Sequence, residues 1–178
     1  MLAVNCKGPV DDRTIGHLLL AAAASFLAGV PALAQVRVSE RGQPKTPFST
    51  SDFGRLRWLE GTWVGTAAGE QPIYERYHIS SDSTIDVTYY RDSAFTQSAG
   101  TGRVYLAAGR VYHSLGPGRW GATQVDSASA YFVPQVNAHN TFAWSLVSPD
   151  EWTATMRTGV SGHERITVYR MRRVGDRR

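Results

Sequence analysis

Two ionisable residues, Glu75 and His113, stand among apolar residues in segments of alternating polarity. Glu75 shares a strand face with Ile73, and His113 shares one with Val111. A buried charge is costly unless it is paired, so we expect Glu75 to pair with an arginine; the alternative is a position at the mouth of a cavity. His113 is either a hydrogen-bonded core histidine or a group that orients a bound molecule.

Aromatic residues recur on the apolar faces of the same segments and are able to wall a cavity. Together with the two ionisable residues they give the ligand-binding candidates, which are Glu75, Tyr89, Tyr105, His113, Phe142 and Trp144. If the interior is filled, the same rings form the core instead. The choice between a pocket and a packed interior therefore stays open at this point.

Catalytic, metal-binding and nucleic-acid-binding motifs are not found in the sequence. It has no Gly-x-Ser-x-Gly elbow, phosphate loop or dinucleotide-binding glycine motif, and its histidines lack the spacing of a zinc site. Cys6 is the only cysteine. The net charge is +4, but basic and aromatic residues are not interleaved as in nucleic-acid-binding modules. We predict a protein that is not an enzyme, with no metal, no cofactor and no nucleic-acid partner.

The elements that position these residues are short strands separated by turn residues such as Ala108-Gly109. After Trp63, strands are predicted at 73–79, 85–90, 101–107, 110–115, 120–125, 128–133, 141–147, 152–157 and 164–172. The connections are too short for crossover helices, so neighbouring strands must be antiparallel. A meander of this length leaves two exposed edges unless it closes. We predict an all-β fold, a single antiparallel up-and-down β-barrel, with a β-sandwich as the second choice.

The barrel domain is predicted to span residues 51–173 and to begin with a short helical turn. Residues 35–50 contain two prolines and few large apolar groups, which is typical of a flexible linker. Residues 174–178 are predicted to be a disordered basic tail.

Residues 1–34 have the pattern of a secretory signal peptide, with a short apolar run followed by small residues. We expect cleavage after Ala34, because Ala32 and Ala34 fit the peptidase's requirement for small side chains. The run is shorter than the ~20 residues that span a bilayer, so no stable membrane insertion is expected after cleavage. A periplasmic or secreted location follows.

The segment RWLEGTWVG, residues 57–65, resembles the Gly-x-Trp signature of lipocalin-like (calycin) barrels, here Gly61, Thr62 and Trp63. The resemblance implies that Trp63 fills the closed end of the barrel, covered by an arginine from the last strand. Arg170 stands at the matching place, and Arg172 is the alternative. The structural barrel-end residues are thus expected to be Gly61, Trp63 and Arg170.

The extended pattern is also similar to uncharacterised lipocalin-like domains of bacterial exported proteins and, more distantly, to nitrobindin-type haem barrels. That distant resemblance makes His163 a possible haem ligand, although Glu164 and Arg165 follow where a porphyrin would need apolar residues. The leading hypothesis is an exported barrel that binds a small apolar or amphipathic molecule. The alternatives are a structural or interaction module of the cell envelope with a filled barrel, and a haem-binding barrel.

Overall fold

A computed structural model of the chain describes residues 47–159 and 163–175. The predicted signal peptide, its cleavage point after Ala34 and most of the predicted linker lie outside the described residues. None of the helices within these ranges is long and apolar enough to cross a membrane.

The described residues form ten strands, preceded by the helix α1 (Thr50–Gly54) and the 3₁₀ turn η1 (Arg57–Leu59). The strands are β1 (Gly61–Thr66), β2 (Ile73–Ser81), β3 (Thr84–Tyr90), β4 (Ser98–Ala107), β5 (Arg110–Leu115), β6 (Gly118–Val125), β7 (Ser129–Val136), β8 (Asn140–Ser148), β9 (Glu151–Thr158) and β10 (Arg165–Arg173). The predicted strands are all present, with bounds that differ by a few residues.

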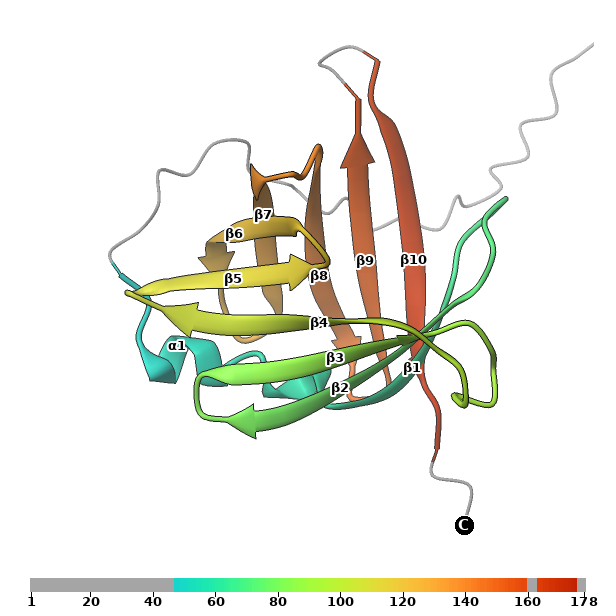
Figure 1. Cartoon of the computed structure of the whole chain (residues 1–178), viewed down its shortest axis with the longest axis horizontal. Helices are drawn as coiled ribbons and strands as arrows, with labels where there is room; N and C mark the ends of the chain where they lie inside the picture. Colours follow the sequence, from blue (N-terminus) through green and yellow to red (C-terminus); the bar gives the residue numbers. More distant parts are fainter. Residues whose placement is uncertain (1–46, 160–162, 176–178) are drawn as a thin grey trace, which may run out of the picture. The chain divides into compact units, whose positions relative to one another are not determined.

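The ten strands form one closed antiparallel barrel in which each strand pairs with its neighbours in the sequence (Figure 1). Closure comes from β1 and β10, where Trp63 is opposite Arg173 and Gly65 is opposite Met171. The prediction of an all-β, up-and-down barrel is confirmed, and the β-sandwich alternative is wrong. Closure removes the two exposed edges that an open meander of these strands would have.

The two helical segments before β1 lie at one end of the barrel (Figure 1). Ser49 caps α1, because its hydroxyl accepts a hydrogen bond from the backbone of Asp52 while the Asp52 carboxylate accepts one from the backbone of Ser49. Phe53, Leu56 and Leu59 are buried in the barrel core. These segments therefore seal one end of the barrel.

The barrel domain extends beyond its predicted limits at both termini. The backbone of Phe48 donates a hydrogen bond to the carbonyl of Gly109, and its side chain packs against the core, so residues 47–50 belong to the domain and not to a linker. The backbone of Val174, the first residue of the predicted tail, donates a hydrogen bond to the carbonyl of Thr62.

Trp63 fills the sealed end, as the resemblance implied, and is completely buried. Its indole nitrogen donates to the carbonyl of Leu59 at 2.7 Å. The guanidinium of Arg173 lies over its ring, 4.2 Å from the ring centroid. At this distance the cation and the π-face attract each other.

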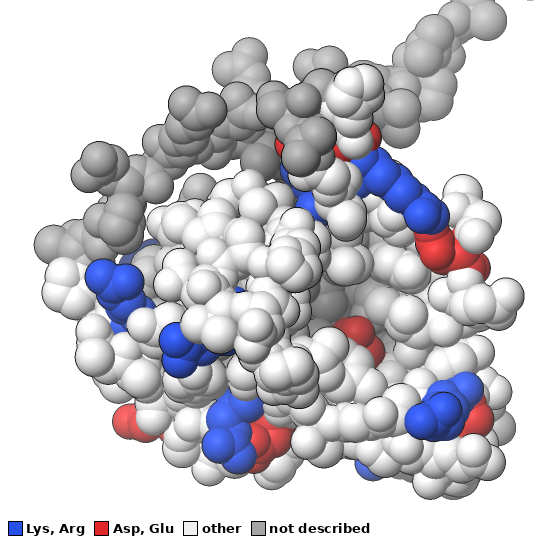
Figure 2. All heavy atoms as spheres, turned by 45° about the horizontal axis from the view of Figure 1, so that its top comes forward, with Lys and Arg blue, Asp and Glu red and all other residues white. Residues whose placement is uncertain are grey.

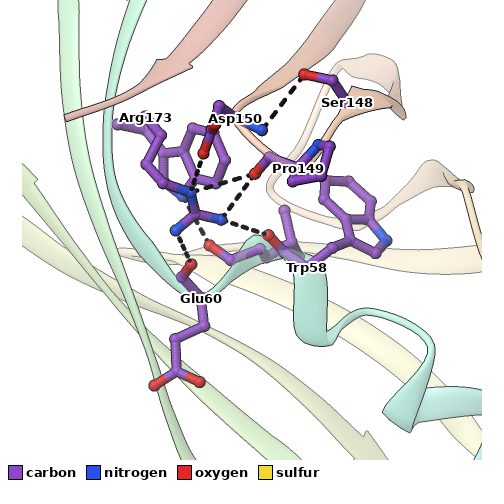
Figure 3. A network of polar contacts seen from close by, with 8 residues as sticks. Trp58, Glu60, Ser148, Pro149, Asp150 and Arg173 are labelled. Carbon is purple, nitrogen blue, oxygen red and sulfur yellow. Dashed lines mark hydrogen bonds and ion pairs between the residues drawn. The ribbon is translucent and has the colours of Figure 1, made fainter. Parts of the chain in front are cut away.

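Arg173 also links the end of β10 to two other segments, the turn before β1 and the connection between β8 and β9 (Figure 3). Its guanidinium donates hydrogen bonds to the carbonyl of Glu60 at 2.6 Å, to that of Pro149 at 3.1 and 3.2 Å, and more weakly to that of Trp58 at 3.4 Å. It also forms an ion pair with Asp150 at 3.3 Å. A planar guanidinium is suited to this role because its donors reach several acceptors at once.

The prediction that Arg170 covers the tryptophan, with Arg172 as the alternative, is wrong. Both arginines lie on the outer face of β10, where they form ion pairs with the carboxylate of Glu151 on β9. The inner face of β10 carries Met171 and Arg173, since successive residues of a strand point to opposite sides. The register of closure places Arg173, and not Arg170, beside Trp63.

Gly61 makes room for this arrangement. Its φ of +129° is unfavourable for other residues, and a Cβ at this position would collide with the Arg173 guanidinium. We expect Gly61→Ala to lower the free energy of unfolding by about 2 kcal/mol. Gly54→Ala is the matched control, because a Cβ there meets nothing within 4 Å; it should leave stability unchanged or raise it by about 0.5 kcal/mol.

Urea unfolding followed by circular dichroism measures both changes. Equal midpoints for the two variants would contradict a special requirement for glycine at position 61.

Candidate ligand-binding cavity

A cavity of about 270 Å³ lies inside the barrel, beyond the sealed end. Its lining comes from seven strands and consists of Ile73, Glu75, Tyr77, Tyr89, His113, Leu115, Trp120, Asn140, Phe142, Trp144, Trp152, Ala154, Met156 and Tyr169. None of these residues is a lysine or an arginine. Figure 2 shows a hollow in the face that it draws, with acidic side-chain atoms visible inside it and basic ones farther out.

Trp152 separates the cavity from the sealed end. Its ring centroid lies 5.8 Å from that of Trp58 and 5.9 Å from that of Trp63, which are the tryptophans of the sealed end. On the other side it lies 5.9 Å from Trp144 and 6.0 Å from Tyr77, which line the cavity. These edge-to-face contacts make Trp152 a rigid floor.

Space remains on the cavity side of Trp152 because a small residue, Ala154, occupies an inward position. Ala154 on β9 lies between Trp144 on β8 and Tyr169 on β10 in the strand register, so two large rings flank a methyl group. A larger side chain at position 154 would project between those rings into the cavity.

Glu75 is buried in the wall of this cavity and accepts a hydrogen bond from the hydroxyl of Tyr77, at 2.8 Å. Burial raises its pKa from 4.5 to about 7, although the hydrogen bond from Tyr77 acts in the opposite direction. The expected arginine partner is not found: no cationic side chain in the described part of the chain contributes to this pKa. The preferred interpretation of Glu75 as half of an ion pair is therefore wrong within the described residues, and the carboxylate lies in the wall of the cavity.

His113 lies in the cavity wall on β5, and its Nε2 shares a hydrogen bond of 3.0 Å with the hydroxyl of Tyr89 on β3. The Tyr89 side chain passes over β4 at Gly102, where an added Cβ would lie only 3.1 Å from the tyrosine ring. Burial lowers the pKa of His113 from 6.5 to about 4, so its imidazole is neutral at pH 7.

Three buried polar side-chain atoms in the described residues have no hydrogen-bond partner. In the described residues, the buried side-chain atoms without a hydrogen bond are Nδ1 of His113 and the indole nitrogens of Trp58 and Trp152. Two of these three residues line the cavity. Such atoms are rare in folded proteins and cost free energy unless a water or a ligand satisfies them.

Five of the six predicted ligand-binding residues line the cavity, namely Glu75, Tyr89, His113, Phe142 and Trp144. Tyr105 does not. Val104 is the buried inward residue of β4, so its neighbour Tyr105 points outward and packs against Tyr112, with ring centroids 5.3 Å apart. Assigning it to the cavity was wrong.

Other lining residues were not among the predicted candidates. Tyr77 is two residues from Glu75, and Tyr169 is two residues from buried Met171, so the period of two was sufficient to find both. Trp120 lies on β6, whose pairing with β7 shifts in register between Arg119 and Trp120. Because of this irregularity, simple alternation along the strand does not predict which way Trp120 points. Its indole nitrogen donates to the carbonyl of Asn140 at 2.9 Å.

The geometry does not fit a haem group. His163 is exposed and is not among the residues that line the cavity. His113 does line it, but Tyr89 engages its Nε2, and about 270 Å³ is too small for a four-pyrrole macrocycle. Within residues 47–159 and 163–175 no group of three or more His, Cys, Asp or Glu is placed to hold a metal ion.

Neither a family model nor a curated protein matches the chain. Among solved structures it is similar to a redesigned β-barrel, with 16% identity and a TM-score of 0.36 over 68% of this chain and 96% of that one. It is also similar to EF1p2_mFAP2b bound to DFHBI, with 14% identity and a TM-score of 0.33 over 71% of this chain and 100% of that one. Nothing about function follows from either similarity.

Proposed function

We propose that this barrel binds a small apolar or amphipathic molecule in the cavity above Trp152, and that it acts as a binding protein and not as an enzyme. The observation that carries the proposal is a cavity of about 270 Å³ with aromatic walls and a few inward polar groups, Glu75 and His113 among them. Small-molecule sites in proteins generally have this composition.

The volume limits the size of the ligand. Sites for drug-sized molecules have volumes of roughly 300–1,000 Å³, and a cavity of roughly 150 Å³ is enough for benzene. A cavity of about 270 Å³ therefore suits one ring with a short substituent.

The filled-barrel alternative receives support only from the sealed end, where Trp63 and Met171 leave no exposed surface. On the other side of Trp152 the interior is open, and His113 is one of the residues of its wall. A barrel whose purpose was packing alone would gain stability from larger residues at such positions.

We also propose an exported, lipocalin-like protein, periplasmic or secreted. The support for export is the apolar run before Ala34, and the support for the family is the Gly-x-Trp signature with a guanidinium stacked on its tryptophan.

Binding of single-ring probes tests the proposed function. We expect toluene, benzyl alcohol or indole to bind the full-length protein saturably by titration calorimetry, and Ala154→Leu to weaken that binding about tenfold or more by filling the cavity. Ala107→Leu adds the same atoms at an exposed site on β4 and should leave binding unchanged. If no probe binds, or if both variants behave alike, the proposal fails.

A further inference from the structure

The cavity wall contains one carboxylic acid and no lysine or arginine, and this asymmetry points to the charge of its ligand. This step rests on the proposed function. Among its lining residues Glu75 is the only carboxylic acid, and no lysine or arginine is present. An anionic ligand would therefore meet a like charge with no compensating cation.

Every other titratable group that faces Glu75 is neutral at pH 7. Burial raises the pKa values of Tyr77 and Tyr89 well above their ordinary value, and burial lowers that of His113 to about 4. Tyr169 on β10 also has a raised pKa, with burial as the main cause. Close to Tyr169, Glu70 and Arg165 pair with each other, so this arginine is already neutralised.

The walls favour positive charge as well. Trp120, Phe142, Trp144 and Trp152 all contribute to the lining, and the π-faces of aromatic rings carry negative potential that attracts cations. The three tryptophans are the side chains best suited to this attraction. A buried carboxylate surrounded by rings is stabilised by a cation that arrives with the ligand, since the protein supplies none.

We propose that the ligand is a small organic cation, a protonated amine carried on a single ring or a short alkyl group, with the Glu75 carboxylate as its counter-ion and the surrounding tryptophans as a cage. The hydroxyl of Tyr77, 2.8 Å from Oε2 of Glu75, holds the carboxylate in place.

Ion pairing in the cavity predicts a proton balance. Burial raises the pKa of Glu75 to about 7, so the carboxyl of the free protein is mostly protonated at pH 6. A bound ammonium group would hold it ionised, so binding at pH 6 should release close to one proton to the buffer. Above pH 8 the carboxyl is already ionised and the release should disappear.

Benzylammonium and benzyl alcohol are the probes for a direct test, since they have nearly the same shape and differ in charge. With the full-length protein at pH 8 we expect benzylammonium to bind about tenfold or more tightly than benzyl alcohol. Glu75→Gln keeps the shape and a group that can accept from Tyr77, and it should weaken benzylammonium about tenfold or more while changing benzyl alcohol less than about twofold. Calorimetry at pH 6 in buffers of different ionisation enthalpy measures the released proton in the wild type and its loss in Glu75→Gln.

The outcomes separate the two proposals. If benzyl alcohol binds and benzylammonium binds no better, or if Glu75→Gln leaves the preference and the proton release unchanged, the cationic ligand is refuted and the binding cavity stands. If neither these probes nor toluene and indole bind the wild-type protein, the proposed function itself fails. Retained binding of benzyl alcohol by Glu75→Gln shows that the variant is folded.

Discussion

Replacing Arg173 with alanine will lower the free energy of unfolding by about 3 kcal/mol. The variant loses the hydrogen bonds to the carbonyls of Glu60 and Pro149 and the stacking on Trp63. Charged hydrogen bonds contribute about 1.5–3 kcal/mol net and a cation–π contact about 0.5–2 kcal/mol. Because the Arg173 side chain is 30% exposed, water compensates part of the sum.

Arg170→Ala and Arg172→Ala are the matched controls for this prediction. Their side chains are 58% and 66% exposed and pair with Glu151 on the outer face. Each change should alter stability by less than about 0.5 kcal/mol. Urea unfolding compares the three variants, and a loss at Arg170 as large as that at Arg173 would contradict the assignment of the covering arginine.

Glu75 and His113 will give the barrel opposite dependences of stability on pH. The folded state raises the pKa of Glu75 from 4.5 to about 7, so it binds more protons than the unfolded chain, and stability is lost as pH rises through this window. It lowers the pKa of His113 from 6.5 to about 4, so stability is lost as pH falls through that window. Each effect amounts to about 3 kcal/mol at full extent.

In the wild type these effects oppose each other between about pH 4.5 and 6.5, so their sum changes little there. In Glu75→Gln only the pH dependence due to His113 should remain, so the free energy of unfolding should rise by about 3 kcal/mol as pH rises from 4 to 6.5. In His113→Gln only the pH dependence due to Glu75 should remain, so the free energy of unfolding should fall by a similar amount between pH 4.5 and about 7. Unfolding curves at several pH values, referred to the double variant, measure both slopes; slopes parallel to the wild type in both single variants would contradict the burial of these groups.

The alternation of residues predicted the barrel and the faces of its strands, because a closed barrel has one buried side and the period of a strand is two. Glu75 and His113 were assigned to the interior on this basis, and both are buried. The same rule, applied to Val104, would have placed Tyr105 outside.

The local sequence pattern could not predict which arginine covers Trp63. It depends on the register in which β10 meets β1, and that register is decided by the closure of the whole sheet. Only afterwards does Met171, buried beside Arg173, show which arginine of β10 faces inward.

The cavity was also beyond local pattern, because it depends on how far side chains reach across the barrel. Ala154 opposite two large rings leaves space, and the passage of Tyr89 over Gly102 connects β3 with β5. Contacts between strands that are not adjacent leave no trace in the period of either strand. The tyrosine that contacts Glu75 is different, because it lies two residues away on the same strand and the period of two places both side chains on one face.

The seam between β1 and β10 has a consequence for the order of folding. The hydrogen bonds of Arg173 to Glu60 and Trp58 join residues 113 and 115 positions apart, and contacts of such long range form late because a long loop must close first. During synthesis β1 leaves the ribosome before the other strands, and it cannot pair with β10 until the last strand has been made. Until then β1 and β9 present unpaired edges to other chains, which makes the interval before closure the stage at which this protein is most exposed to aggregation.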